Sequence, residues 1–121
     1  MKTKLKLFKL ANKLFERYHF IYKPFYFFYK KISDRQKIAL LKNIIKPGMR
    51  VLDLGANIGF YTVLFSKLAG ENGKVFAFEP DAKNYEYLEE NAKKLYNVVI
   101  EKKAVSDKTG KINFYISKDL N

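Results

Sequence analysis

The residues best suited to chemistry lie in one short stretch, Asp53-Leu54-Gly55-Ala56-Asn57-Ile58-Gly59. It falls at a predicted strand-to-helix turn, which is where a cofactor meets the carboxyl end of a sheet. Gly55 has no Cβ, so a ligand can lie against the turn, and Gly59 lets helix and strand pack closely. Asn57 stands where a third glycine is expected, and asparagine tolerates left-handed backbone angles. The turn is therefore a candidate cofactor site.

The spacing of the glycines separates this turn from two other nucleotide-binding loops. A nicotinamide fingerprint needs glycines at its first, third and sixth positions, which here are Gly55, Asn57 and Phe60. A P-loop needs Gly-Lys-Ser or Gly-Lys-Thr after the turn, and neither follows. The spacing that fits has an acid two residues before the first glycine and a second glycine four residues after it, as in Asp53, Gly55 and Gly59.

A second acid, Glu79, ends the next predicted strand. Neighbouring parallel strands end at the same edge of a sheet, so we expect the Glu79 carboxylate to face the turn. A carboxylate accepts two hydrogen bonds and a ribose diol offers two donors, which explains an acid at this position. The acid indicates an adenosine-containing cofactor, and the glycine spacing favours S-adenosylmethionine.

The residues around the two acids resemble S-adenosylmethionine-dependent methyltransferases of the FkbM family. The likeness covers residues 47–116, and its most specific part is the Gly-Ala-Asn-x-Gly form of the turn. The other matching positions are residues 73–81, then Asn84, Tyr85, Leu88 and Asn91, and finally residues 104–107 with Gly110 and Phe114. The resemblance implies a Rossmann-like class I methyltransferase fold.

The same resemblance implies a role for each site residue. The turn, with Asp53, Gly55, Ala56, Asn57 and Gly59, would hold the methionine end of S-adenosylmethionine, and Glu79 would hold its ribose. Pro80, Ala104 and Val105 would border the adenine. Members of the family mostly O-methylate sugars, polyketide-like products and other small metabolites, so a small-molecule or glycan hydroxyl is the expected acceptor. The sequence assigns no general base.

The elements that must position these residues alternate from residue 50 onward. We expect strands at residues 51–54, 74–78 and 98–105, helices at 58–69 and 81–96, and a fourth, antiparallel strand at 111–116. Strand, helix, strand, helix and strand in this order predict an α/β fold with a mostly parallel sheet. A partial cofactor-binding domain is therefore expected over residues 47–121.

The predicted domain is incomplete when set beside the FkbM family. Members continue into a fourth strand with an Asp-x-Glu-Gly type motif, and nothing in residues 108–121 matches it. That strand forms one wall of the cofactor crevice and would cover the first strand, which is otherwise an exposed edge. A fragment, a decayed copy, and an enzyme completed by a partner chain or a second copy all remain open.

The segment before the domain, residues 1–46, is basic and aromatic. Residues 1–50 hold 14 Lys/Arg and two acids, whereas residues 51–121 hold ten of each, so the first part carries the net charge of +12. Helices are expected over residues 2–21, with Pro24 as an interruption, and from about residue 33 to 46. Three interpretations stay open: a helical cap on the sheet, a membrane-surface helix, or a nucleic-acid contact, the last without a recognised module.

Composition narrows the remaining function classes. The chain has no cysteine, which excludes a disulfide scaffold, a zinc ribbon and thiol catalysis, and its one histidine, His19, argues against a metal site. Lysines interrupt every apolar run near the amino terminus, so neither a signal peptide nor a membrane span is expected. We expect a cytoplasmic methyltransferase or, as the alternative, a non-catalytic basic protein on the same fold that binds a membrane surface or RNA.

Overall fold

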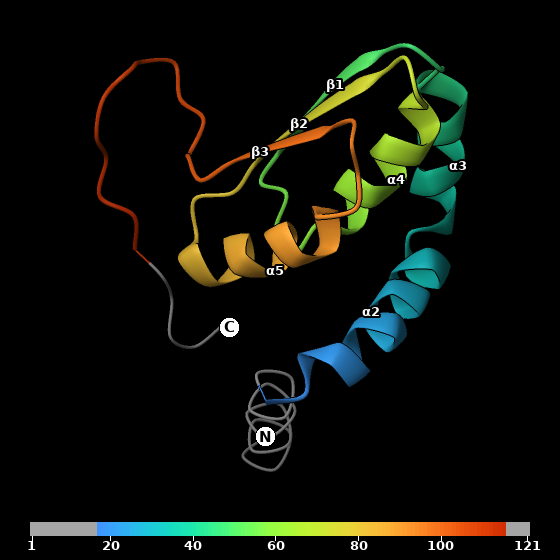
Figure 1. The fold of residues 1–121 in the computed structure, drawn as a ribbon, viewed down its shortest axis with the longest axis horizontal. Helices are drawn as coiled ribbons and strands as arrows, with labels where there is room; N and C mark the ends of the chain where they lie inside the picture. The colour runs from blue at the N-terminus through green and yellow to red at the C-terminus, as the bar shows by residue number, and fades with distance from the viewer. Residues whose placement is uncertain (1–16, 116–121) are drawn as a thin grey trace. The chain divides into compact units, whose positions relative to one another are not determined.

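The computed structural model describes residues 17–115, except the side chains of residues 19, 20 and 22 (Figure 1). The chain divides into two compact units, the second of which spans Gln36–Ile116. Most of the expected helix at residues 2–21 lies outside the described residues, as does residue 116 at the end of the expected fourth strand. No helix among residues 17–115 has the length and apolarity needed to cross a membrane.

Three parallel strands form the sheet of the second unit. They are β1 (Arg50–Leu54), β2 (Lys74–Phe78) and β3 (Val98–Glu101), in the order β1-β2-β3. The first two strands match their predicted positions within a residue. The third is shorter than predicted because the amide of Lys103 donates to the carbonyl of Glu101 (2.9 Å), which turns the chain out of the ladder. The described part of the predicted antiparallel strand, residues 111–115, is irregular and exposed, so that prediction was wrong.

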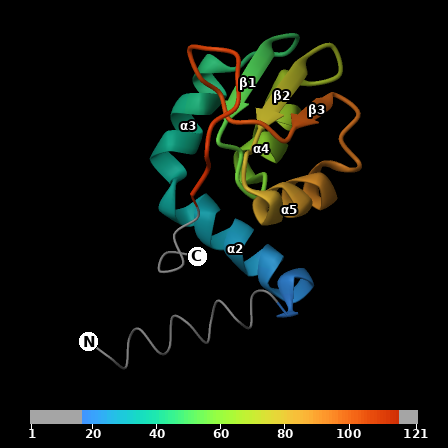
Figure 2. The ribbon, with the colours of Figure 1, turned by 90° about the vertical axis from the view of Figure 1, so that its left-hand side faces the viewer.

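Two helices connect the strands and lie on one face of the sheet (Figures 1 and 2). They are α4 (Phe60–Ala69), between β1 and β2, and α5 (Ala82–Ala92), between β2 and β3. Right-handed crossovers between strands placed in sequence order put both helices on the same side. Both helices are shorter than predicted: α4 starts after the turn at residues 55–59, and α5 ends at residue 92 rather than 96. Asp81 caps α5, its carboxylate accepting from the amide of Asn84 (2.8 Å).

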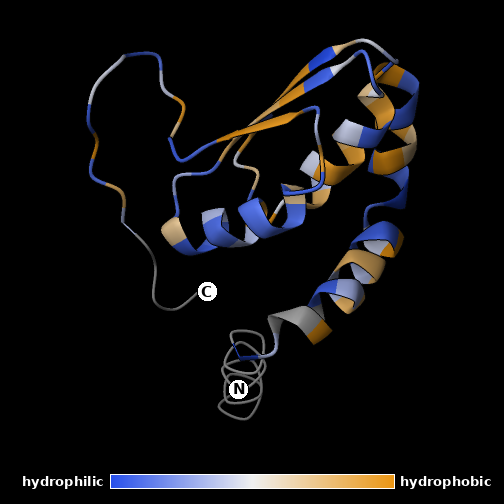
Figure 3. Ribbon diagram, in the orientation of Figure 1, coloured by the Kyte–Doolittle hydropathy of each residue, from blue (hydrophilic) through white to orange (hydrophobic). Residues whose placement is uncertain are grey.

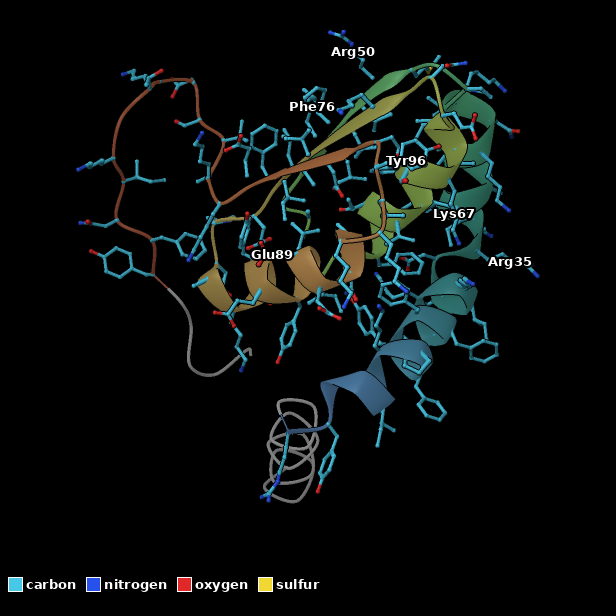
Figure 4. The ribbon with its side chains drawn as sticks, viewed as in Figure 1. Arg35, Arg50, Lys67, Phe76, Glu89 and Tyr96 are labelled. Carbon is cyan, nitrogen blue, oxygen red and sulfur yellow. The ribbon has the colours of Figure 1, made fainter. Side chains whose placement is uncertain are left out.

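The two faces of the sheet differ in their covering. On the helix side Val75 and Ala77 are fully buried, and Ala77 joins Ala56 and Leu88 in the core. The strands are largely apolar along their length (Figure 3), and Figure 4 shows Phe76 pointing away from α4 and α5, toward the opposite face. On β1, Leu52 and Leu54 are 64% and 56% exposed. Among the described residues, β1 has a neighbouring strand on one side only.

Two helices precede the sheet in the chain. The first, α2 (His19–Ser33), runs through Pro24, so the expected interruption at this proline was wrong. Pro24 is in the second turn of the helix, where its ring removes one backbone hydrogen bond and leaves the others in place. The second, α3 (Arg35–Ile44), has an apolar stripe, with Ile38 and Leu41 half-buried, and Ile45 is buried just after the helix ends.

Candidate functional site

The turn between β1 and α4 is built on the end of β2. The amides of Gly55 and Ala56 both donate to the carbonyl of Phe78, at 3.0 and 2.9 Å. Gly55 has a φ of +76°, and a Cβ placed there would meet no atom within 4 Å, so the backbone at Gly55 faces open space. This is the opening that the sequence predicted for a ligand lying against the turn.

Gly59 has a different task from Gly55. Its φ is +92°, and a Cβ added to it would lie 2.9 Å from Cδ1 of Leu88 on α5. The close approach is therefore to α5, whereas the sequence led us to expect packing between helix and strand. Asn57 has a φ of +52°, which confirms the left-handed conformation expected there. Its side-chain oxygen accepts from the amide of Ile58 (2.7 Å), which satisfies one donor of the turn.

Glu79 is buried, with 5% of its surface exposed, and its side chain points into the turn. Its Oε2 accepts from the amide of Asn57 (2.7 Å) and its Oε1 from the amide of Asp81 (2.9 Å). The amide of Glu79 donates to the carbonyl of Glu101 (3.1 Å), which continues the pairing of the sheet. Each carboxylate oxygen keeps a lone pair for a further donor. Glu79 therefore faces the turn as predicted, and it also holds the turn in shape.

Asp53 lies beneath the turn at the end of β1. It is 8% exposed, and its Oδ2 accepts from the hydroxyl of Thr62 on α4 (2.6 Å). Burial raises the pKa of Asp53 above its ordinary value, the hydrogen bond from Thr62 lowers it, and the negative charge of Glu79 raises it again. Two acids on adjacent strand ends thus give the site negative character, which favours a positively charged ligand.

The other predicted site residues are less closely tied to the turn. Pro80 is half-buried and directly follows Glu79. Ala104 and Val105 lie beyond the carboxyl end of β3, on the exposed irregular segment, and Val105 is 54% exposed. Ala56, by contrast, is buried within the turn. The structure therefore brings Asp53, the turn and Glu79 together and leaves residues 104 and 105 on the surface.

Three residues support the site in ways that the sequence did not reveal. Thr62 is fully buried, and its hydroxyl donates to Asp53. The side-chain amide of Asn91, on α5, donates to the backbone carbonyl of Ile58 (2.6 Å), and this bond ties the turn to α5. Asp81 orients Glu79 through its backbone amide. A polar residue on the apolar face of a helix was the available signal for Asn91, since Leu88 and Ala92 share that face.

An acid near the end of the first strand, two glycines in the turn that follows it, and a buried acid directly after the second strand mark the cofactor-binding end of a Rossmann-like class I methyltransferase fold. A family model described as the TRM5/TYW2 methyltransferase domain matches residues 16–111, and the chain belongs to this family. Solved structures of methyltransferases share this α/β fold. The α/β methyltransferase class expected from the sequence is thereby confirmed.

Two solved structures illustrate the likeness. An S-adenosylmethionine-dependent methyltransferase from Aquifex aeolicus is 40% identical over 54% of this chain and 36% of its own, with a TM-score of 0.51. A candidate rRNA methylase from Clostridium thermocellum is 28% identical over 57% of this chain and 39% of its own, with a TM-score of 0.54.

A curated relative matches a shorter stretch. Protein-L-isoaspartate O-methyltransferase 1 from Arabidopsis thaliana is 40% identical over 42 residues, which are 35% of this chain and 18% of that protein. The chain therefore aligns with well under half the length of each of these three proteins.

Proposed function

We propose that the unit Gln36–Ile116 binds S-adenosylmethionine at the turn and is the cofactor-binding part of a methyltransferase. The observation that carries this proposal is the buried Glu79 carboxylate, fixed against the amide of Asn57 beside an open glycine backbone. The site fits the cofactor in two respects. The open space beside the Gly55 backbone can receive a ligand, and a side chain at position 55 would reduce that space. The negative charges of Asp53 and Glu79 match a ligand that carries positive charge on sulfur and nitrogen.

The assignments within the site follow from these positions. The turn, with Asp53, Gly55, Ala56, Asn57 and Gly59, would hold the methionine end, and Glu79 would accept from the ribose hydroxyls. Pro80, Ala104 and Val105 would border the adenine. Because Ala104 and Val105 are exposed, they would have to move toward the bound adenine or be covered by it. Bound S-adenosylmethionine supplies an activated methyl group, so the protein's own task is to bind and orient it.

The binding claim is tested by calorimetric titration with S-adenosylhomocysteine. Glu79→Gln removes the charge and keeps one of the two acceptor oxygens, so we expect affinity to fall about tenfold or more, and circular dichroism checks that the variant is folded. Glu101→Gln is the matched control, because Glu101 ends the adjacent strand and is partly exposed beside Lys103 (2.9 Å). Absence of binding by the folded wild-type protein, or equal losses in both variants, would overturn the proposal.

We infer that the methyl acceptor is a hydroxyl group of a small molecule or glycan. The support is the Gly-Ala-Asn-x-Gly form of the turn and the other positions shared with the FkbM family. Transfer of labelled methyl groups from S-adenosylmethionine to glycans and small alcohols tests this. RNA and isoaspartyl peptides serve as competing acceptors, because two of the similar proteins are described as acting on those classes. Labelling of RNA or peptide alone contradicts the inference.

We also propose that another strand completes the sheet along β1, from a partner chain or a second copy. The supporting observation is that Leu52 and Leu54 are exposed on a strand with an unpaired edge among the described residues. A strand at this edge would add the second wall of the cofactor crevice. Methyl transfer would then depend on that association, whereas the turn and Glu79 are already in place without it.

A further inference from the structure

The helix α2 carries a continuous apolar stripe that faces solvent. Its residues are Ile21, Phe25, Phe28, Tyr29 and Ile32, which are 60%, 69%, 64%, 65% and 61% exposed. Their spacing of four, three, one and three residues places them on one side of the helix, along about 16 Å of its length. We call these five residues the α2 stripe. Large apolar side chains in such a contiguous row mark an interaction surface.

Outside the stripe, α2 carries three lysines together with further aromatic residues. Lys23, Lys30 and Lys31 lie outside the stripe, and the last turn of the helix contains two of them. The single acid in residues 17–35 is Asp34, whose carboxylate accepts from Lys30 (2.7 Å). Lys23 lies 5.8 Å from the ring centre of Phe27, on the same part of the helix surface. At 100° per residue, Lys31 therefore lies next to the apolar row, and Lys23 and Lys30 lie on the opposite side of the helix.

We propose that the α2 stripe binds the surface of an anionic lipid bilayer, with α2 lying in the plane of the interface. The apolar row enters the boundary between headgroups and acyl chains, Lys31 beside the row contacts negatively charged headgroups, and the lysines of the opposite side add long-range attraction to them. The 15 residues of α2 are too few to span the hydrocarbon core, which needs about 20. Tyr29 has an apolar ring and a polar hydroxyl, a combination that suits the interface.

The composition of the stripe favours lipid over nucleic acid. Bases bind aromatic rings by stacking, yet both ends of the stripe are aliphatic, at Ile21 and Ile32. Aliphatic side chains gain from entering an apolar phase and offer no stacking face. The charge argument is common to both partners, so it is the continuity of the apolar row that distinguishes them.

The first experiment is co-sedimentation of the full chain with phosphatidylcholine vesicles, with and without phosphatidylserine, at low and high salt. We expect binding that requires phosphatidylserine and weakens with salt. Phe25→Ser combined with Phe28→Ser should lower the partition coefficient at least about tenfold. The matched control is Tyr96→Ser combined with Tyr115→Ser, because these aromatics are 71% and 84% exposed but lie outside α2. We expect the control to bind as the wild type does.

A second measurement reports the position of α2 directly. The protein contains no tryptophan, so Phe25→Trp introduces a single reporter in the stripe, and Tyr96→Trp places one elsewhere. Vesicles should shift the emission of the first to shorter wavelength and allow quenching by brominated lipid, with no change in the second. Titration with S-adenosylhomocysteine in the same variants keeps this proposal separate from cofactor binding.

Three outcomes would overturn the membrane proposal. The first is equal binding by the stripe variant and its control. The second is binding of single-stranded RNA that the stripe variant loses while its vesicle binding persists. The third is a Phe25→Trp reporter whose emission is already shifted without vesicles and is insensitive to brominated lipid, since the stripe would then be covered by protein.

Discussion

Asp53 and Glu79 are both buried carboxylates, yet their partners differ. Glu79 accepts hydrogen bonds from two backbone amides, those of Asn57 and Asp81, and these bonds stabilise its charge. Asp53 receives only the hydroxyl of Thr62, and its burial outweighs that bond, so its pKa is raised. The two acids therefore play unequal parts: Glu79 supports the folded turn, and Asp53 maintains a buried charge that the fold disfavours.

We predict that Asp53→Asn stabilises the protein at neutral pH. Because the pKa of Asp53 is raised in the folded state, the wild type loses stability as pH rises from the unfolded value, about 3.9, through the folded value. Asparagine keeps an acceptor for Thr62 and carries no charge. Urea unfolding should therefore show a more stable variant at pH 7, and the difference should vanish below about pH 4.

The same substitution should weaken binding of S-adenosylhomocysteine, because it removes negative charge from the site. Asp107→Asn is the control, since that acid is exposed on the irregular segment after β3. A variant that is less stable than the wild type at pH 7, by the same amount as at pH 4, would contradict this account of Asp53.

The two glycines of the turn should respond differently to alanine. Both have positive φ, so each substitution costs about 1–2 kcal/mol of backbone strain. Gly59→Ala also displaces Leu88 from its place in the core, whereas Gly55→Ala meets no atom within 4 Å. We expect Gly59→Ala to lower the free energy of unfolding more, and Gly55→Ala to lose ligand affinity beyond its effect on folding. Denaturation and calorimetry on both variants check this, and the reverse order would refute it.

At the level of elements, one buried asparagine joins α4 to the start of β3. Asn97 is 4% exposed, and its side-chain amide donates to the backbone carbonyls of Ser66 and Gly70, both at 3.0 Å. Its side-chain oxygen accepts from the hydroxyl of Ser66 (2.6 Å). Asn97 is thus a further donor to the two carbonyls, which also accept from the backbone amides of Gly70 and Gly73 (both 3.1 Å), and it is the acceptor of the Ser66 hydroxyl.

We predict that Asn97→Ala lowers the free energy of unfolding by about 2–3 kcal/mol, because it removes three hydrogen bonds and leaves the buried Ser66 hydroxyl without its acceptor. Asn43→Ala, on the exposed surface of α3, is the matched control and should change stability little. Urea denaturation of both variants measures the difference. Affinity for S-adenosylhomocysteine should persist in the folded Asn97→Ala protein, since the hydrogen bonds of Asn97 lie away from the turn. Equal stability of the Asn97→Ala and Asn43→Ala variants would show that these hydrogen bonds do not stabilise the fold.

The elements that could be predicted were those with local signals. Apolar runs ended by Gly55 and by Glu79 located β1 and β2, and the glycine spacing located the turn. Pro24 and residues 111–116 were misjudged because a proline near the start of a helix costs only one hydrogen bond, and alternating residues form a strand only when a neighbour pairs with them. The contacts of Thr62, Asn91 and Asn97 join distant parts of the chain and left little trace in local pattern.

For the molecule as a whole, the unpaired edge of β1 is continuous with the uncovered face of the sheet among the described residues. Leu52 and Leu54 are exposed on that face, and Phe76 of β2 lies on it in register with Leu52. An exposed apolar edge strand readily pairs with another strand. The half of the crevice that the described residues build is thus also a surface suited to association.

We predict that the chain self-associates through β1 when no other partner is present. Sedimentation velocity should give a mass above the 14.2 kDa of one chain, increasing with concentration. Leu52→Lys should shift the protein to a monomer, because a charge on an apolar edge strand opposes pairing. Leu40→Lys is the control, since Leu40 is 58% exposed on α3. A wild type that stays monomeric at all concentrations would contradict self-association, and dissociation by both variants would show that β1 is not the interface.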